Sequence, residues 1–354
     1  MRNKLDILVV LIVLVAMLGT FNLAGAQTSW ACPEGFEGQT LRVFNWGNYV
    51  ADTTIPDFEE LCGVTVEYFE YGSNDQALSV LQAGTAEYDI VVPTADLVPL
   101  LIENELIQAL DHSRIPNIEN IGPIIDSLSL DDGHQYSAAY QWGTVGIGYD
   151  TTVVDTPITS WDEFLAYDGR VAWLDDSRLM LKIALQKLGY EFSSNDPAQI
   201  DEAAEYLLNT PQSDIFAISG SPADLLLQGE VDAIVVHARN LVNIMQSCEC
   251  EDFAYAFPSD GFVAYYDAMV IPATAPNPEL AHAFIDYILD ANVNADLSNA
   301  IGSGAPNEAA QEFIDEDILN NGISYPDMEM VNAFLTDTIM IDKTRQGIEI
   351  YVKA

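Results

Sequence analysis

The chain has 354 residues, of which 12 are Lys or Arg and 55 are Asp or Glu, giving a formal net charge of −43. An electrostatic field of this sign repels nucleic acid and anionic membrane surfaces, so neither is expected as a partner. A single hydrophobic core tends to stop growing near about 250 to 300 residues, so the length predicts two domains.

The first residues indicate export. Two basic residues precede an apolar run over residues 7–18, and residues 24–26 have the small-x-small pattern of a signal-peptidase site. The run falls short of the roughly twenty apolar residues that a membrane-spanning helix needs. We therefore expect residues 1–26 to be a signal peptide that is cleaved after Ala26, and the mature protein to be periplasmic or secreted.

Strand and helix patterns then alternate along the chain. Leu41–Trp46 and Tyr88–Val92 are continuous apolar runs typical of buried strands, and residues 64–68 alternate between apolar and polar. Pro56–Cys62 and Ala77–Ala83 have helical spacing, and each is followed by a glycine, which favours helix termination. This βαβαβ order predicts a mostly parallel sheet with crossover helices.

Four cysteines in an exported chain indicate disulfides. The sequence does not fix their pairing, but Cys32 and Cys62 could tie the mature N-terminus to the end of the first helix, where Leu61 is expected to face inward. Cys248 and Cys250 could close a local bridge, and a lipid on Cys32 is an alternative. The four histidines have no metal-ligand spacing, so neither a metal nor a cofactor is expected.

Further strands are expected in the second half of the chain. They are Val171–Leu174, Ala233–Val236, Phe262–Tyr266 and Ala268–Ile271, followed by a helix over Pro278–Leu289. Asp176, His237 and Asp267 each stand at or just beyond the end of such a run, as Trp46 and Thr94 do near the N-terminus. Ligands bind beyond the carboxyl ends of the strands in sheets of this kind, so these residues are candidates for a binding site.

Short stretches along nearly the whole mature chain carry a family resemblance. They are Phe44–Trp46, Tyr71–Asn74, Tyr88–Thr94, Trp142–Thr144, Leu174–Asp176, Gly229–Val231, Ile271–Ala273 and Pro306–Asn307. In this set and order, the chain resembles the periplasmic spermidine/putrescine-binding proteins, which are substrate-binding proteins of ABC importers. The resemblance implies the α/β type II periplasmic-binding fold, with two lobes, hinge strands and an interlobe cleft that closes on the ligand.

The resemblance also implies the lobe boundaries. The first crossing between lobes is expected near Gln141–Gly148 and the return near Tyr265–Ala268. Lobe one is then formed by residues 27–141 plus 266–311, and lobe two by residues 142–265 plus 312–354.

Carried over position by position, the resemblance implies a ligand site made of aromatic faces and carboxylates. The expected ligand-binding residues are Trp46, Asn48, Tyr49, Thr94, Asp96, Asp176, His237, Tyr265, Asp267 and Asp337. Ring faces shield the methylenes of a polyamine and attract its ammonium groups, which carboxylates bind by charge-assisted hydrogen bonds. The sequence departs from the family at several of these positions: Asn48 replaces an acid or serine, His237 replaces a tryptophan, and Asp96 and Asp337 add acids.

Some of these residues also have structural interpretations. Asp176 could cap a helix that begins at Ser177. Tyr265 and Tyr266 lie on opposite faces of one strand, so one of them is expected in the core. Asp267 lies within an apolar run, where a lone acid is costly to bury without a partner.

The expected function is capture of putrescine, spermidine or a related amine by a monomer, followed by delivery to an ABC permease in the membrane. No catalytic motif indicates an enzyme. This hypothesis requires that no arginine or lysine lies opposite the aromatic rings. One alternative is an amino acid or another organic cation, because Arg178 and Arg239 lie near the site segments and could bind a carboxylate. A second alternative is a secreted ligand-sensing subunit.

Overall fold

The structure is a computed structural model that describes residues 28–84, 87–191, 194, 196–209, 215–261, 263–327 and 331. The expected signal peptide, its cleavage site at Ala26 and the candidate site residue Asp337 lie outside these residues. Within the described ranges, no helix has both the length and the apolar character needed to cross a membrane.

One nine-stranded sheet runs through the described part of the molecule. Its strand order is β2-β1-β3-β9-β4-β7-β5-β6, and β8 pairs with β4. The strands are β1 Thr40–Trp46, β2 Thr65–Tyr71, β3 Ile90–Val91, β4 Ser137–Asp150, β5 Val171–Leu174, β6 Ile215–Ser219, β7 Ala233–His237, β8 Phe253–Ala256 and β9 Val263–Val270. Within each half of the sheet the neighbouring strands β2-β1-β3 and β6-β5-β7 are parallel, as the βαβ pattern predicts. The two central strands β9 and β4 are antiparallel to each other.

Helices cover both halves of the sheet. They are α2 Thr54–Cys62, α3 Asn74–Ala83, α4 Val98–Glu103, α5 Pro123–Leu128, α6 Trp161–Leu165, α7 Ser177–Lys187, α8 Pro197–Asn209, α9 Pro222–Leu227, α10 Ala238–Cys248, α11 Pro278–Ile288, α12 Ala291–Ile301 and α13 Glu316–Leu319. Short 3-10 turns are η1 Ala95–Leu97, η2 His112–Arg114, η3 Pro116–Asn120 and η4 Glu308–Glu312. Gly63 and Gly84 adopt the left-handed conformation that ends α2 and α3, as expected from the sequence.

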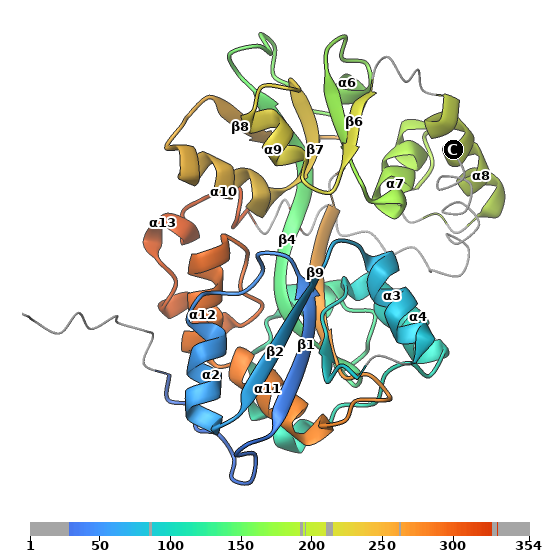
Figure 1. Cartoon of the computed structure of the whole chain (residues 1–354). Coiled ribbons are helices and arrows are strands. Elements are labelled where there is room, and N and C mark those ends of the chain that lie inside the picture. Colours follow the sequence, from blue (N-terminus) through green and yellow to red (C-terminus); the bar gives the residue numbers. More distant parts are fainter. Residues whose placement is uncertain are drawn as a thin grey trace, which may run out of the picture.

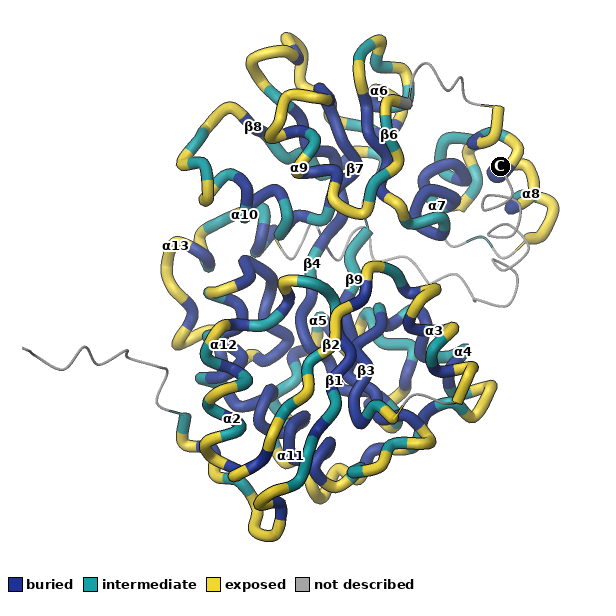
Figure 2. Tube along the Cα trace, in the orientation of Figure 1, coloured by how far each residue is buried: buried dark blue, intermediate teal, exposed yellow. Residues whose placement is uncertain are grey.

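The elements divide into two lobes that are joined by β4 and β9 (Figure 1). Lobe one contains β1–β3 with α2–α5, α11 and α12, and lobe two contains β5–β7 with α6–α10. Each lobe has its own buried interior (Figure 2), with residues such as Phe58 and Phe284 in lobe one and Trp161 and Met180 in lobe two. The two domains expected from the chain length are therefore two cores on one continuous sheet.

The strand β4 extends through both lobes. Its first part pairs with β9, from Ser137 opposite Val270 to Val145 opposite Val263, and its last part pairs with β7 and β8 of lobe two. The predicted crossings at 141–148 and 265–268 fall inside these two strands. Lobe motion must therefore pass through two hydrogen-bonded strands, not through a flexible linker.

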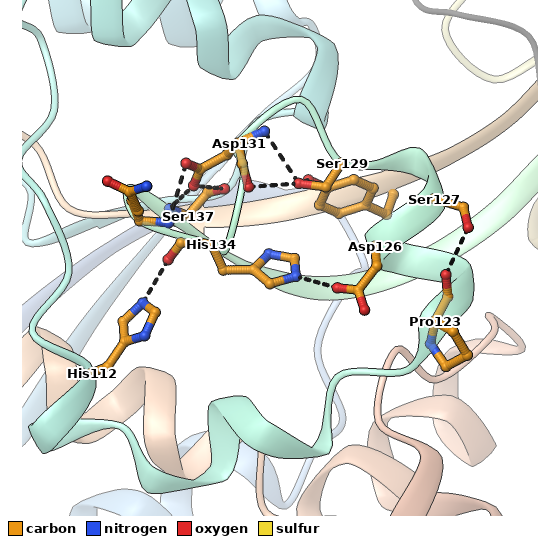
Figure 3. A network of polar contacts seen from close by, with 10 residues as sticks. His112, Pro123, Asp126, Ser127, Ser129, Asp131, His134 and Ser137 are labelled. Atoms are coloured by element: carbon orange, nitrogen blue, oxygen red, sulfur yellow. Dashed lines mark hydrogen bonds and ion pairs between the residues drawn. The ribbon is translucent and has the colours of Figure 1, made fainter.

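The start of β4 is anchored by a polar network (Figure 3). Asp131 Oδ2 accepts hydrogen bonds from the backbone N–H of Tyr136 and Ser137 and from the Ser137 hydroxyl. The hydroxyl of Tyr266 on β9 donates to Ser129 Oγ in the same turn, at 3.1 Å. The network fixes β4 and β9 on the lobe one side of the crossing.

Two sequence-based expectations about packing need correction. Leu61 is 42% exposed, because the buried face of α2 is centred on Phe58 and Cys62. Residues 312–325 were expected in lobe two. Instead Ile314 and Ile318 pack with Ala295 of α12, so this segment covers lobe one.

Both disulfides left open by the sequence are formed, Cys32 with Cys62 and Cys248 with Cys250. The first ties the described N-terminal segment to the end of α2. Trp30 in that segment packs against Phe58 and donates a hydrogen bond to Asp286 on α11. Because the sulfur of Cys32 is in a disulfide, the structure leaves no thiol there for lipid attachment.

Candidate functional site

A pocket of about 370 Å³ lies between the lobes, at the carboxyl ends of the strands. Its lining residues are Trp46, Gly72, Ser73, Asn74, Asp75 and Thr94 from lobe one, Leu174, Asp175, Asp176, Ser177, Arg178, Ile218, Gly220, His237, Arg239 and Asn240 from lobe two, and Tyr265 and Asp267 from β9. Four carboxylates and two guanidinium groups therefore face one pocket. Among the described residues, no group of His, Cys, Asp or Glu has a metal-binding arrangement.

Asp267 lines the pocket and is only 4% exposed. Its Oδ2 accepts a hydrogen bond from the Tyr49 hydroxyl at 2.8 Å, and its Oδ1 accepts one from Thr94 Oγ1 at 3.0 Å. Asn74 in turn donates to Thr94 Oγ1 and accepts from the Thr94 backbone N–H. Burial raises the pKa of Asp267 to about 6, although the hydrogen bonds from Tyr49 and Thr94 act in the opposite direction.

Arg239, at the start of α10, lies over an aromatic ring of lobe one. Its guanidinium carbon is 4.2 Å from the centroid of the Tyr49 ring, within the range of a cation–π contact. Burial raises the pKa of the Tyr265 phenol, and a hydrogen bond from Arg239 acts against this rise. Arg239 thus reaches across the pocket from lobe two toward the segment that follows β1 and toward β9.

Aromatic rings line two sides of the pocket. The Trp46 ring packs against Tyr71, with ring centroids 4.6 Å apart, and His237 packs edge-on against Tyr265 at 5.0 Å. Burial and, secondarily, the charge of Arg239 lower the pKa of His237 to about 3, so this imidazole is neutral at physiological pH. The sequence predicted that either Tyr265 or Tyr266 lies in the core. Tyr266 is the core residue, with 1% of its surface exposed.

Asp176 combines the two roles considered from the sequence. Its Oδ1 accepts hydrogen bonds from the backbone N–H of Arg178 and Leu179, both at 3.1 Å, so it caps α7. Asp176 also lines the pocket. The Arg178 guanidinium points to lobe one, where its Nη1 lies 3.7 Å from Asp96 Oδ2.

The structure brings most of the expected site residues together. Those that line the pocket are Trp46, Thr94, Asp176, His237, Tyr265 and Asp267. Tyr49 lies behind the pocket and reaches it through Asp267, and Asp96 reaches it through Arg178. Asn48 is not brought to the pocket: it is exposed, with a φ of 52°, and its backbone N–H donates to Glu70.

The sequence-based site missed the loop before α3. Ser73 caps α3, and Asn74 orients Thr94 beside Asp267. The signal was present in the sequence, because Tyr71–Asn74 is one of the stretches that carry the family resemblance and Ser73 is a good helix N-cap. Its contribution to the pocket depends on Thr94, which is 20 residues from Asn74 in sequence.

Comparison with known families identifies the chain. Residues 53–323 match the family described as bacterial extracellular solute-binding protein. The chain belongs to this family. The two-lobe fold predicted from the sequence is confirmed, and with it the extracellular solute-binding class.

This solute-binding protein has relatives with named ligands. It is 31% identical over 319 residues to a putrescine/cadaverine-binding protein of Pseudomonas aeruginosa, which covers 86% of this chain and 88% of that protein. It is 29% identical over 299 residues to the spermidine/putrescine-binding periplasmic protein of Escherichia coli, covering 83% of this chain and 85% of that protein. A solved structure of a putative spermidine/putrescine ABC transporter from Listeria monocytogenes superposes with a TM-score of 0.82 at 29% identity, covering 89% of this chain and 98% of that one.

Proposed function

We propose that this solute-binding protein captures a small organic amine of the polyamine class outside the cytoplasm and delivers it to the permease of an ABC importer. The observation that carries the proposal is the buried carboxylate of Asp267, which faces a pocket between Trp46 and Tyr265. The named ligands of the relatives support the same class of solute. The protein acts as a monomeric binding subunit without catalytic activity.

The pocket meets the chemical needs of an ammonium group. A buried carboxylate is destabilised by the loss of water, and Asp267 receives hydroxyl hydrogen bonds but no ion pair from the described residues. The charge of Arg239 acts on Asp267 without ion-pair contact, and an ammonium ligand supplies a positive charge in direct contact with the carboxylate. Each charge-assisted hydrogen bond contributes about 1.5 to 3 kcal/mol. Trp46 and Tyr265 add contact with the methylene chain, at about 0.8 kcal/mol for each buried CH₂. Micromolar affinity, about −8 kcal/mol, is within reach of these contributions.

The test is titration calorimetry of the mature chain with putrescine, cadaverine and spermidine. Binding of at least one amine is expected, and Asp267→Asn should weaken it by more than about 2 kcal/mol, because a charged hydrogen bond is lost in a buried site. The variant should remain folded, since asparagine removes a buried charge and retains its shape. Asp52→Asn changes the net charge equally at an exposed position and serves as the matched control. No heat from any amine at high micromolar concentration, or an unchanged affinity of Asp267→Asn, contradicts the proposal.

A further inference from the structure

We infer that the preferred ligand carries a carboxylate as well as an ammonium group, and that Arg239 binds the carboxylate. The inference rests on the proposed function, because it keeps Asp267 as the partner of a ligand ammonium group, and it changes the other end of the ligand from an ammonium group to a carboxylate. It replaces the expectation of a purely cationic guest, which required that no arginine lies opposite the aromatic rings. Arg239 lies over the ring of Tyr49.

The two arginines of the pocket differ in their partners. Arg178 already has a carboxylate partner, because Asp96 lies 3.7 Å from its Nη1. Arg239 makes no ion pair with any residue in the part of the chain that the structure describes. Its contacts are the face of the Tyr49 ring and the Tyr265 side chain. The charge of Arg239 also lowers the pKa of Asp267, but no carboxylate of the described residues is in ion-pair contact with it. A planar guanidinium that lines a pocket without such a contact is suited to bind a ligand carboxylate in a bidentate manner.

Two residues that line the pocket each have a buried side-chain nitrogen without a partner in the described part of the chain. Trp46 Nε1 and His237 Nδ1 are buried, and neither has a hydrogen-bond partner among the described residues. An indole nitrogen can only donate, and a neutral imidazole can donate through Nδ1 in one tautomer. An ammonium group is also only a donor, so it cannot satisfy the Trp46 indole nitrogen, whereas a carboxylate oxygen can accept from that nitrogen and from Arg239. His237 Nδ1 does not discriminate, because in its other tautomer it accepts a hydrogen bond.

Tyr49 connects the two charges that would hold the ligand. Its hydroxyl donates to Asp267, and its ring face carries Arg239. The negative and positive groups of the protein therefore lie around the same side chain, Asp267 for the ammonium and Arg239 for the carboxylate. A diamine that placed its second ammonium group beside Arg239 would experience like-charge repulsion, which provides discrimination against plain diamines.

The test compares ligands that differ in one end group. 5-Aminopentanoate has the four-methylene chain of putrescine with one ammonium replaced by a carboxylate, and glycine, β-alanine and 4-aminobutyrate vary the spacing. Calorimetry of the mature protein should show at least one amino carboxylate binding about tenfold or more tightly than putrescine, as expected for one charged interaction gained. Arg239→Gln should abolish this preference by weakening the amino carboxylate about tenfold or more, without weakening putrescine.

Arg114→Gln is the matched control. This substitution removes the same charge as Arg239→Gln. In the native protein Arg114 pairs with Glu279 on the surface of lobe one, outside the pocket. Binding of diamines with no measurable binding of any amino carboxylate overturns the inference and leaves the proposed function standing. An equal loss of both ligand types in Arg239→Gln also overturns it, because Arg239 would then support the pocket without recognising the carboxylate. Absence of binding by every amine and amino carboxylate rejects the proposed function itself.

Discussion

Arg178 and Asp96 form an ion pair between the lobes, with Nη1 of Arg178 on α7 at 3.7 Å from Oδ2 of Asp96 in η1. Both side chains are mostly buried, at 10% and 18% exposure. Because the partners belong to different lobes, the contact can form only when the lobes are closed. The pair therefore contributes to the free energy of closure and, through closure, to ligand affinity.

A double-mutant cycle tests this link. Arg178→Gln and Asp96→Asn should each weaken ligand binding by about 1 to 3 kcal/mol, because each leaves one charge buried without its partner. The double variant should lose less than the sum of the two. Calorimetry on the four proteins gives the coupling energy, and strictly additive losses would show that the two side chains act independently.

Ligand affinity should depend on pH through Asp267. Burial raises the pKa of this carboxyl to about 6 in the ligand-free protein, so a neutral acid predominates below that pH. Only the ionised form binds an ammonium group strongly, so affinity should rise from pH 5 to pH 7, by up to about tenfold per unit below the pKa, and then level off. His237, with a pKa near 3, stays neutral over this range and adds no dependence. Calorimetry at several pH values should give a flat profile for Asp267→Asn, and a profile that persists in this variant would assign the titration to another group.

The Tyr49 hydroxyl should set the midpoint of that pH profile. Its hydrogen bond stabilises the charged form of Asp267, so Tyr49→Phe should raise the pKa of Asp267 further. The expected result is a midpoint above that of the unmodified protein, with little change in affinity at high pH. The phenylalanine ring retains the face on which Arg239 lies. A midpoint that stays in place would mean that the hydroxyl does not tune the carboxyl.

The Cys32–Cys62 disulfide should contribute most of the cross-link stability. It closes a loop with a sequence separation of 30, whereas Cys248–Cys250 spans a separation of 2. On the chain-entropy model the longer loop is worth about 3 to 4 kcal/mol. Replacing Cys32 and Cys62 by serine should lower the free energy of unfolding by about this amount, measured by urea denaturation. The matched control is serine at Cys248 and Cys250, and an equal effect of both replacements would contradict the loop-length argument.

Local patterns predicted most of the elements but not the partners of their side chains. The strand over Val171–Leu174 is observed with the predicted bounds, because apolar runs and the turn residues beside them depend on neighbours in sequence. Leu61 was misplaced because its exposure depends on what packs against α2. The segment around Ile314 was assigned to the wrong lobe because no local sequence pattern predicts that it packs against α12.

The site shows the same division. The resemblance led to Trp46, Tyr265 and Asp267, which line one pocket. The sequence also identified Arg239 as a possible carboxylate partner, but its place over Tyr49 joins residues 190 positions apart, and no local pattern predicts such a contact. That contact is the observation from which a carboxylate group on the ligand is inferred.

The place of β9 in the sheet has a consequence for biogenesis. It lies between β3 and β4, although residues 263–270 are translated only after the whole of lobe two. During synthesis, lobe two can complete its core while β3 and the first half of β4 still have unpaired edges, and such edges are templates for aggregation. A chain interrupted before residue 263 would lack Asp267 and also expose these edges. Folding of this protein therefore depends on keeping β3 and β4 from pairing with other strands until β9 has been synthesised.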